Sequence, residues 1–339
     1  MFEEKINIRS LSVGYQQRSK NGLQLLSQLN LSCKKGEITG IIGRNGTGKS
    51  TLLKTMAGLL PPLHGEIFIN NCNLLSYQRK ALAKLVSFVS TEAPSLPSLK
   101  VIELVSLGRY PYTDWSGRLT QTDRSIIRQS VQQAGISHIA AKSVSEISDG
   151  ERQRAMIARA LAQDTDILIL DEPTAFLDLP NKYEILRLLN HLASEKEKTI
   201  IFSTHDLNIA LHEADTIWLL HNNNILTGAP EDLILKQDFI KLFDNSSLEF
   251  DDDKGEIRPK RSFFLKSGLR GESHLRFWTS HALERIGIEA VKEDNELNIS
   301  IDNTGEIPVW NLIYKKNRFL AHSVYELCLI LKSIINQKV

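Results

Sequence analysis

The sequence predicts an α/β fold with a largely parallel β-sheet, followed by a small C-terminal α+β domain. Three observations predict it. Short apolar runs alternate with segments of helical periodicity, glycine follows several of these segments, and the pattern changes after Pro259. A chain of 339 residues is long for one compact core. We therefore expect one domain over residues 1–258 and a second over residues 259–339.

The expected strands of the first domain are short and rich in β-branched residues, as in strands buried on both faces. They lie at residues 5–13, 37–42, 66–69, 86–90, 167–170 and 199–203. Helices are expected between them at residues 49–57, 101–108, 123–134, 151–161 and 181–194. Gly58 and Gly135 stand where two of these helices should end, because glycine commonly follows the last helical turn.

The segment at residues 250–257 is typical of a β-hairpin whose turn carries Asp251, Asp252 and Asp253. We interpret this acidic run as a solvated loop, in preference to a metal site. A linker at 259–261 precedes a helix at 274–286, strands at 296–301 and 309–314, and a final helix that opens with a capping box from Ser323 to Glu326. This second domain carries no catalytic constellation in its sequence, and added stability is our default expectation for its role.

Composition excludes several functions. The 41 Lys and Arg residues balance 40 Asp and Glu residues, so charge does not favour nucleic acid as a partner. Cys33, Cys72 and Cys328 lie far apart without a CxxC pattern, which predicts neither a zinc site nor disulfides. Acidic residues near the N-terminus argue against a signal peptide, and no apolar run reaches the roughly 18 residues of a membrane span.

A glycine-rich loop follows the apolar run at 38–42 and precedes an expected helix, which is the context of a P-loop. Its backbone N–H groups can surround phosphates, Lys49 can reach the β- and γ-phosphates, and the Ser50 hydroxyl can bind Mg²⁺. The candidate nucleotide-binding residues are Gly43, Arg44, Asn45, Gly46, Thr47, Gly48, Lys49, Ser50 and Thr51.

The apolar strand at 167–170 ends in two acids, Asp171 and Glu172. Ligands of open α/β sheets bind at the carboxyl ends of the strands, so these side chains should face the bound nucleotide. Asp171 would hold Mg²⁺, and Glu172 would act as general base toward the attacking water. Two acids after a strand are more often an ordinary polar loop, but the P-loop upstream favours the catalytic interpretation.

A third element, Ser148-Asp149-Gly150-Glu151, precedes the acid pair, and with it the sequence resembles the ABC ATPase family. The family's usual signature is Leu-Ser-Gly-Gly-Gln, so Asp149 and Glu151 depart from it, whereas Ser148 and Gly150 are kept. The resemblance implies a P-loop domain with a mostly parallel core sheet, an antiparallel β subdomain and a helical subdomain. Ser148 could equally be a helix N-cap, which is compatible with phosphate binding.

Further residues match the family in order. Tyr15 resembles the aromatic residue that stacks on adenine, Asp178 belongs to a segment like the D-loop, and His205 is similar to the switch histidine at the γ-phosphate. The resemblance thus implies Glu172, His205 and Lys49 as catalytic residues, with ATP and Mg²⁺ as cofactors.

One family residue is missing. The Q-loop glutamine should fall near Thr91, which has Glu92 beside it. Either an oxygen of Thr91 or Glu92 replaces it at the metal, or Mg²⁺ relies on Ser50 and Asp171; our hypothesis is that Glu92 compensates.

The resemblance is most specific for transporter subunits. The short segment between Lys49 and Ser148 leaves no room for the long coiled coil of chromosome-maintenance relatives, and residues 101–112 with Leu119, Thr120 and Asp123 resemble subunits that power uptake of ferric siderophores, haem or cobalamin. Such a subunit would work at the cytoplasmic face of the membrane.

The implied partners are a second copy in a head-to-tail dimer, transmembrane permease subunits that dock near residues 91–112, and indirectly an extracytoplasmic substrate-binding protein. A regulatory ATP-binding module with weak turnover, or a soluble ABC protein without a membrane partner, are the alternatives.

Overall fold

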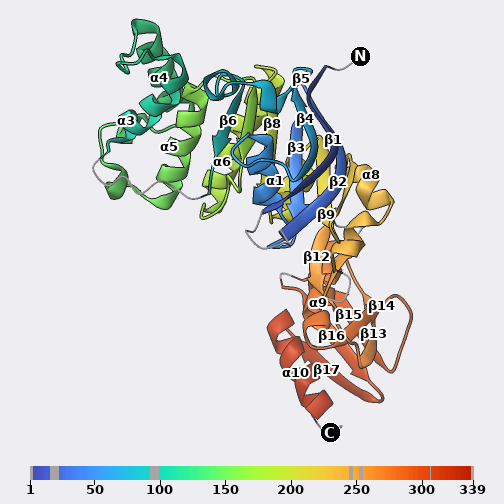
Figure 1. Ribbon diagram of the computed structural model, residues 1–339. Helices are drawn as coiled ribbons and strands as arrows, with labels where there is room; N and C mark the ends of the chain where they lie inside the picture. The colour runs from blue at the N-terminus through green and yellow to red at the C-terminus, as the bar shows by residue number, and fades with distance from the viewer. Residues whose placement is uncertain are drawn as a thin grey trace. The chain divides into compact units, whose positions relative to one another are not determined.

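The computed structural model describes residues 3–15, 23–91, 99–243, 247–251, 255–305 and 307–336. The chain divides into two compact units, Met1–Ile257 and Arg258–Val339, shown from blue to red along the chain in Figure 1. Each unit has its own apolar core.

A six-stranded sheet in the order β10-β9-β3-β8-β7-β6 forms the centre of the first unit. All neighbours in it pair in parallel except β10 and β9, which are antiparallel. Its strands are β3 (Ile38–Gly43), β6 (Val86–Val89), β7 (Ile167–Leu170), β8 (Thr199–Thr204), β9 (Thr216–His221) and β10 (Asn224–Gly228). β3, β7 and β8 are buried along their full length, which explains their continuous apolar sequences.

A second, antiparallel sheet has the order β2-β1-β4-β5. It consists of β1 (Glu4–Tyr15), β2 (Leu23–Lys34), β4 (His64–Ile69) and β5 (Cys72–Asn73). Its inner face and helix α1 (Lys49–Met56) share one apolar core with Ile41, Ile169 and Trp218 of the parallel sheet. One face of the central sheet is therefore covered by the antiparallel sheet and α1.

Helices cover the other face. The principal ones are α3 (Val101–Ser106), α4 (Gln121–Gln133), α5 (Asp149–Ala162) and α6 (Leu179–Ser194), which enclose a large core with Leu168, Leu170 and Phe202. Figure 1 shows α3, α4 and α5 gathered together on one side of this unit. A Cβ on Gly108 would lie 2.1 Å from the carbonyl oxygen of Arg159, so the 3₁₀ segment η2 (Leu107–Tyr112) contacts α5 directly.

Shorter elements complete the first unit. They are η1 (Leu74–Ser76), α2 (Arg79–Leu82), η3 (Ser137–Ile139), η4 (Val144–Glu146), α7 (Leu207–Glu213), α8 (Pro230–Leu235), η5 (Asp238–Phe243), β11 (Leu248–Asp251) and β12 (Glu256–Pro259). β11 and β12 form a two-stranded sheet, in agreement with the predicted hairpin, although Asp252 and Asp253 of its turn lie outside the described residues.

The C-terminal unit is a five-stranded sheet in the order β14-β13-β15-β16-β17. Its elements are β13 (Leu265–Arg270), α9 (Ser273–Arg285), β14 (Ile288–Val291), β15 (Leu297–Asp302), β16 (Val309–Tyr314), β17 (Asn317–Ala321) and α10 (Val324–Asn336). Leu283 of α9 and Leu327 and Leu331 of α10 pack with Leu297 and Leu312 of the sheet, so both helices contribute to the same core.

The predicted fold class is confirmed: a mostly parallel core, an antiparallel sheet, a helical region and a C-terminal α+β unit are all present. Several local predictions are wrong. Residues 107–108 belong to a 3₁₀ segment and not to α3, and Pro259 ends β12 and is not part of a linker. Helices α4, α5 and α6 each begin two residues before the expected position, because Thr120, Ser148 and Asp178 cap them.

Candidate functional site

The glycine-rich loop between β3 and α1 forms one wall of the candidate site. Gly46 and Gly48 have φ angles of 81° and 102°, which L side chains rarely adopt. Gly48 stands directly before α1, so the unpaired N–H groups of the first helical turn face this loop. The local geometry therefore suits the binding of phosphate groups.

Lys49 begins α1, and its ammonium group lies back over the loop. Its Nζ donates hydrogen bonds to the carbonyl oxygens of Gly43 at 2.8 Å and Arg44 at 3.2 Å. Burial lowers the pKa of Lys49, whereas the negative charges of Glu172 and Asp171 oppose that shift. Lys49 therefore lies close enough to the acid pair for the two charges to act on its ammonium group.

Neighbouring side chains extend the wall. Thr47 Oγ1 donates to the Arg44 carbonyl at 2.8 Å, and Ser50 is exposed on the first turn of α1. Thr51 is buried, and its hydroxyl lies 3.1 Å from Tyr15 Oη. Tyr15 is 46% exposed, so its ring stands beside the P-loop helix and is accessible for stacking on a base.

The two acids follow β7, which pairs in parallel with β8. Asp171 is 4% exposed, and its Oδ1 accepts a hydrogen bond from Ser203 Oγ at 2.7 Å. The same Ser203 oxygen accepts a hydrogen bond from the Glu172 N–H at 2.9 Å. One hydroxyl on the neighbouring strand thus fixes the carboxylate of the first acid and the backbone of the second.

Glu172 has a φ of 48°, in the left-handed region that is unfavourable for a residue with a side chain. Its Oε2 lies 3.4 Å from His205 Nδ1, which follows β8. The Glu172 side chain is 24% exposed and that of His205 63% exposed. Both groups are therefore accessible to a ligand that lies over the P-loop.

A cavity of about 340 Å³ adjoins the same loop. Gly43, Arg44, Asn45 and His205 line it on the polar side, and Ile42, Leu207, Leu242, Phe243, Leu248 and Ile257 supply an apolar side. This cavity places Arg44 and Asn45 beside His205.

Thr91 follows β6, the neighbour of β7. Its Oγ1 donates a hydrogen bond to the Asp171 carbonyl oxygen at 3.0 Å. Thr91 therefore lies at the acid pair, as the sequence predicts, but its hydroxyl proton is directed to the backbone. Glu92 lies outside the described residues.

The signature segment lies at the start of α5. Ser148 is the N-cap: its Oγ accepts from the Glu151 N–H at 3.2 Å, and Glu151 Oε2 accepts from the Ser148 N–H at 2.9 Å. The Ser148 N–H and, at 3.0 Å, its Oγ both donate to Glu151 Oε2, and these two hydrogen bonds lower the pKa of Glu151. A Cβ on Gly150 would come within 3.0 Å of Leu177, so the signature segment packs on the segment before α6.

Asp178 caps α6, and its Oδ1 accepts hydrogen bonds from the Asn181 N–H at 3.2 Å and from its side-chain amide at 2.5 Å. Arg154 of α5 donates to Asn181 Oδ1 at 2.5 Å and also pairs with Glu184. The helix that carries the signature is thus joined to the helix that carries Asp178.

The comparison that decides the family is with an uncharacterised ABC transporter ATP-binding protein of Methanocaldococcus jannaschii. It is 38% identical over 280 residues, which cover 80% of this chain and 95% of that protein. The chain belongs to the ABC transporter ATP-binding family. Residues 26–175 match the family model of the ABC transporter, and residues 267–332 match that of the iron ABC transporter C-terminal domain.

Two further comparisons agree with this family assignment. A petrobactin import ATP-binding protein of Bacillus anthracis is 40% identical over 211 residues, covering 62% of this chain and 77% of that protein. The solved dimeric structure of a post-hydrolysis ATP-binding cassette with ADP and Pi is 27% identical, with a TM-score of 0.60, covering 66% of this chain and 98% of that one. The protein is therefore an ATP-binding ATPase.

The ABC ATPase brings most predicted site residues together within one copy. His205 contacts Glu172, Ser203 joins Glu172 to Asp171, and the charges of both acids act on Lys49. Tyr15 adjoins Thr51. Among the described residues, no hydrogen bond or ion pair joins Ser148, Gly150 or Glu151 to the P-loop or the acid pair. Within one copy, the predicted site residues therefore form two groups: the P-loop with the acid pair and His205, and the signature residues at the start of α5.

Sequence reasoning missed the role of Ser203. The residue stands in the same short segment as His205, but only the parallel register of β7 with β8, in which Leu170 lies opposite Phe202, brings its hydroxyl to Asp171. A polar residue at the end of an otherwise apolar strand was the available signal.

No helix among the residues placed by the structure is long and apolar enough to span a membrane.

Proposed function

We propose that this ABC ATPase hydrolyses MgATP to energise the import of an iron complex, with a ferric siderophore as the favoured cargo. The observation that carries the proposal is the match of residues 267–332 to the iron ABC transporter C-terminal domain, on a chain that also holds a complete set of P-loop, acid and histidine side chains. The petrobactin relative supports a siderophore; these relatives do not support haem or cobalamin, the other cargoes expected from the sequence.

The donor set fits Mg²⁺. An exposed Ser50 hydroxyl and the Asp171 carboxylate provide few protein oxygens, and Mg²⁺ characteristically combines one or two such ligands with substrate phosphates. Bound Mg²⁺ would neutralise charge on the phosphates. Thr91 or Glu92 remains a proposed additional ligand.

The chain's own residues supply the remaining chemistry. Glu172 would accept a proton from the attacking water as the water oxygen bonds to the γ-phosphorus and the bond to the leaving β-phosphate oxygen breaks. Lys49 and His205 would stabilise the negative charge on the γ-phosphate, and Tyr15 would stack on adenine. The hydrogen bond from the Glu172 N–H to Ser203 holds the base in position.

We further propose a head-to-tail dimer, supported by the dimeric cassette and by the separation of the signature from the P-loop. Ser148, Gly150 and Glu151 of one copy, together with Asp178, would complete the nucleotide site of the other. Phe176, which is 82% exposed beside this segment, is consistent with a surface that a second copy covers.

The proposed permease surface lies near residues 91–112, of which 99–112 belong to the helical region and 92–98 lie outside the described residues. Tyr110 is 73% exposed and Leu107 is 49% exposed there, and Trp115 just beyond is 99% exposed. Aromatic side chains on the surface are typical of interaction sites. We propose that transmembrane permease subunits bind here at the cytoplasmic face of the membrane, and that an extracytoplasmic binding protein delivers the cargo to them.

The test uses the protein assembled with its permease subunits. We expect Glu172→Gln to lower ATP hydrolysis by at least about a hundredfold while MgATP binding is retained, because only the proton acceptor is lost. Uptake of a radiolabelled ferric siderophore should stop in parallel. Hydrolysis that is already absent in the parent protein and unchanged by Glu172→Gln would favour the regulatory alternative, and normal iron uptake in the variant would refute the proposed coupling.

A further inference from the structure

A cavity in the C-terminal unit lies between α9 and the strands β13 and β14. Its volume is about 290 Å³, close to the lower end for small-molecule sites. Leu269, Ala290 and Val291 form an apolar wall, while Ser273, Arg276 and Lys292 bring polar groups to it. It belongs to a different compact unit from the nucleotide site.

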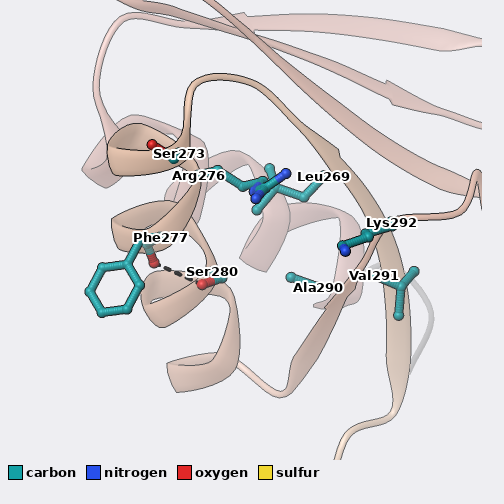
Figure 2. A pocket seen from close by; sticks show the side chains of 8 residues that line it. All are labelled: Leu269, Ser273, Arg276, Phe277, Ser280, Ala290, Val291 and Lys292. Atoms are coloured by element: carbon teal, nitrogen blue, oxygen red, sulfur yellow. Dashed lines mark hydrogen bonds between the residues drawn. The ribbon is translucent and has the colours of Figure 1, made fainter. Parts of the chain in front are cut away.

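Figure 2 shows the positively charged ends of Arg276 and Lys292 directed into the same space, the first from α9 and the second from the segment after β14. Neither side chain makes an ion pair with an acidic residue in the described part of the chain, whereas nearby Arg270 pairs with Asp294 and Lys266 pairs with Glu289. Both side chains are exposed to solvent, so an anion that enters the cavity from solution can reach their charged ends.

The start of α9 also borders the cavity, with the carboxylate of its N-cap residue Glu272 turned to a neutral partner. The N-cap residue Glu272 makes no side-chain hydrogen bond to the helix amides. Its carboxylate accepts instead from Asn303 Nδ2 at 2.9 Å. The first-turn N–H groups of a 13-residue helix therefore lie beside Ser273 at the edge of the cavity.

We propose that this cavity binds a small organic anion with at least two negatively charged oxygen groups, a polycarboxylate or a phosphate monoester. Arg276 would bind one anionic group through its planar guanidinium and Lys292 the other. The apolar wall would contact the carbon skeleton, which an inorganic ion lacks. This site is independent of the function proposed above.

The experiment is calorimetric titration of the full-length protein, with its nucleotide site saturated by ADP so that added anions cannot occupy the P-loop. The probes are tricarballylate, glycerol 3-phosphate, inorganic phosphate and, as a monovalent control, acetate, all at constant ionic strength. We expect one of the two organic polyanions to bind at least about tenfold more tightly than phosphate or acetate, and the better of them identifies the ligand class. Hydrogen exchange should slow at the start of α9.

Arg276→Gln and Lys292→Gln should each weaken this binding about tenfold or more, since each removes a charge-assisted contact. The matched control is Lys266→Gln combined with Arg270→Gln, which removes two charges from the same unit outside the cavity lining and should change affinity less than about threefold. If either cavity variant is unstable, the other suffices. Absence of organic-anion binding, equal binding of inorganic phosphate, or equal weakening by the control would overturn the proposal.

Discussion

Ser203 holds both acids of the nucleotide site through a single oxygen atom, which donates to Asp171 and accepts from Glu172. We expect Ser203→Ala to lower the rate constant of ATP hydrolysis about tenfold to a hundredfold, as is typical when a group that orients metal or catalytic ligands is lost. ATP affinity measured without Mg²⁺ should change less than about twofold, because no nucleotide contact is removed. Steady-state ATPase assays and nucleotide titration provide the two readouts.

The control for this prediction is Ser87→Ala. Ser87 is equally buried in the same sheet, but its hydroxyl bonds to the Ile167 carbonyl oxygen and to Thr165, away from the acids. A similar loss of ATPase rate in both variants would mean that Ser203 contributes through general stability and not through the acid pair.

The lowered pKa of Lys49 predicts that nucleotide binding depends on pH. Burial lowers its pKa below the ordinary value for lysine, so the free protein begins to lose this charge at a less alkaline pH than an exposed lysine would. Phosphates favour the charged form, so in alkaline solution, where the free protein has begun to lose this proton, MgATP binding should take up protons, and it should weaken as the pH rises further. Titrations in two buffers of different ionisation enthalpy measure the proton uptake.

The comparison for Lys49 is Lys54→Gln, in the last turn of the same helix. This variant should retain the proton uptake, because Lys54 takes no part in the P-loop hydrogen bonds. If the parent protein binds MgATP without taking up protons, Lys49 is not the titrating group.

At the scale of elements, a buried ion pair joins η2 to α4. Arg109 Nε lies 2.8 Å from Asp123 Oδ1, and each side chain is 5% exposed. Asp123→Asn should lower the free energy of unfolding by about 3 to 5 kcal/mol, since it leaves a buried guanidinium without its counter-charge. Urea unfolding followed by circular dichroism measures this loss. Glu3→Gln, which removes the ion pair between the exposed Glu3 carboxylate and Lys5, should change the free energy of unfolding far less.

The same pair has a pH signature. Hydrogen bonds from Thr120, together with Arg109, lower the pKa of Asp123 in the folded protein. Its stabilising effect is therefore complete above the ordinary aspartate pKa of about 4 and is lost as the pH falls through the lowered value. The stability difference between the parent protein and Asp123→Asn should shrink below that pH.

The elements predicted correctly from the sequence are those with a continuous apolar run. The prediction is wrong or missing where an element depends on contacts with residues far away in the sequence. The predicted bounds of β7 are confirmed, because Ile167–Leu170 is buried on both faces. The predicted strands do not include β2, although its leucines alternate with polar residues, or β13, in which Ser267 and Gly268 interrupt the apolar pattern. The P-loop and acid pair are local motifs, whereas the Ser203 contact depends on strand register, which one sequence does not specify.

At the scale of the whole molecule, the two compact units have separate cores. The P-loop, the acid pair and His205 all belong to the first. We expect deletion of residues 262–339, which keeps the β11–β12 hairpin, to leave MgATP affinity and basal hydrolysis within about twofold of the full-length values. Nucleotide titration and ATPase assays measure both. Lys49→Ala in the shortened protein is the negative control, and loss of nucleotide binding on deletion alone would contradict independent folding.

Helix α5 links two surfaces that the proposed transport cycle must coordinate. Ser148 caps its beginning, while at its other end Arg109 Nη1 donates to the Ala162 carbonyl oxygen at 2.9 Å and Gly108 touches Arg159. At about 1.5 Å per residue, the helix is roughly 20 Å long. A displacement of its N-terminal end, caused by nucleotide bound to a partner copy, would move the segment that carries Tyr110. The contact is close because Gly108 has no side chain: a Cβ there would lie 2.1 Å from the Arg159 carbonyl oxygen and would force η2 away from α5.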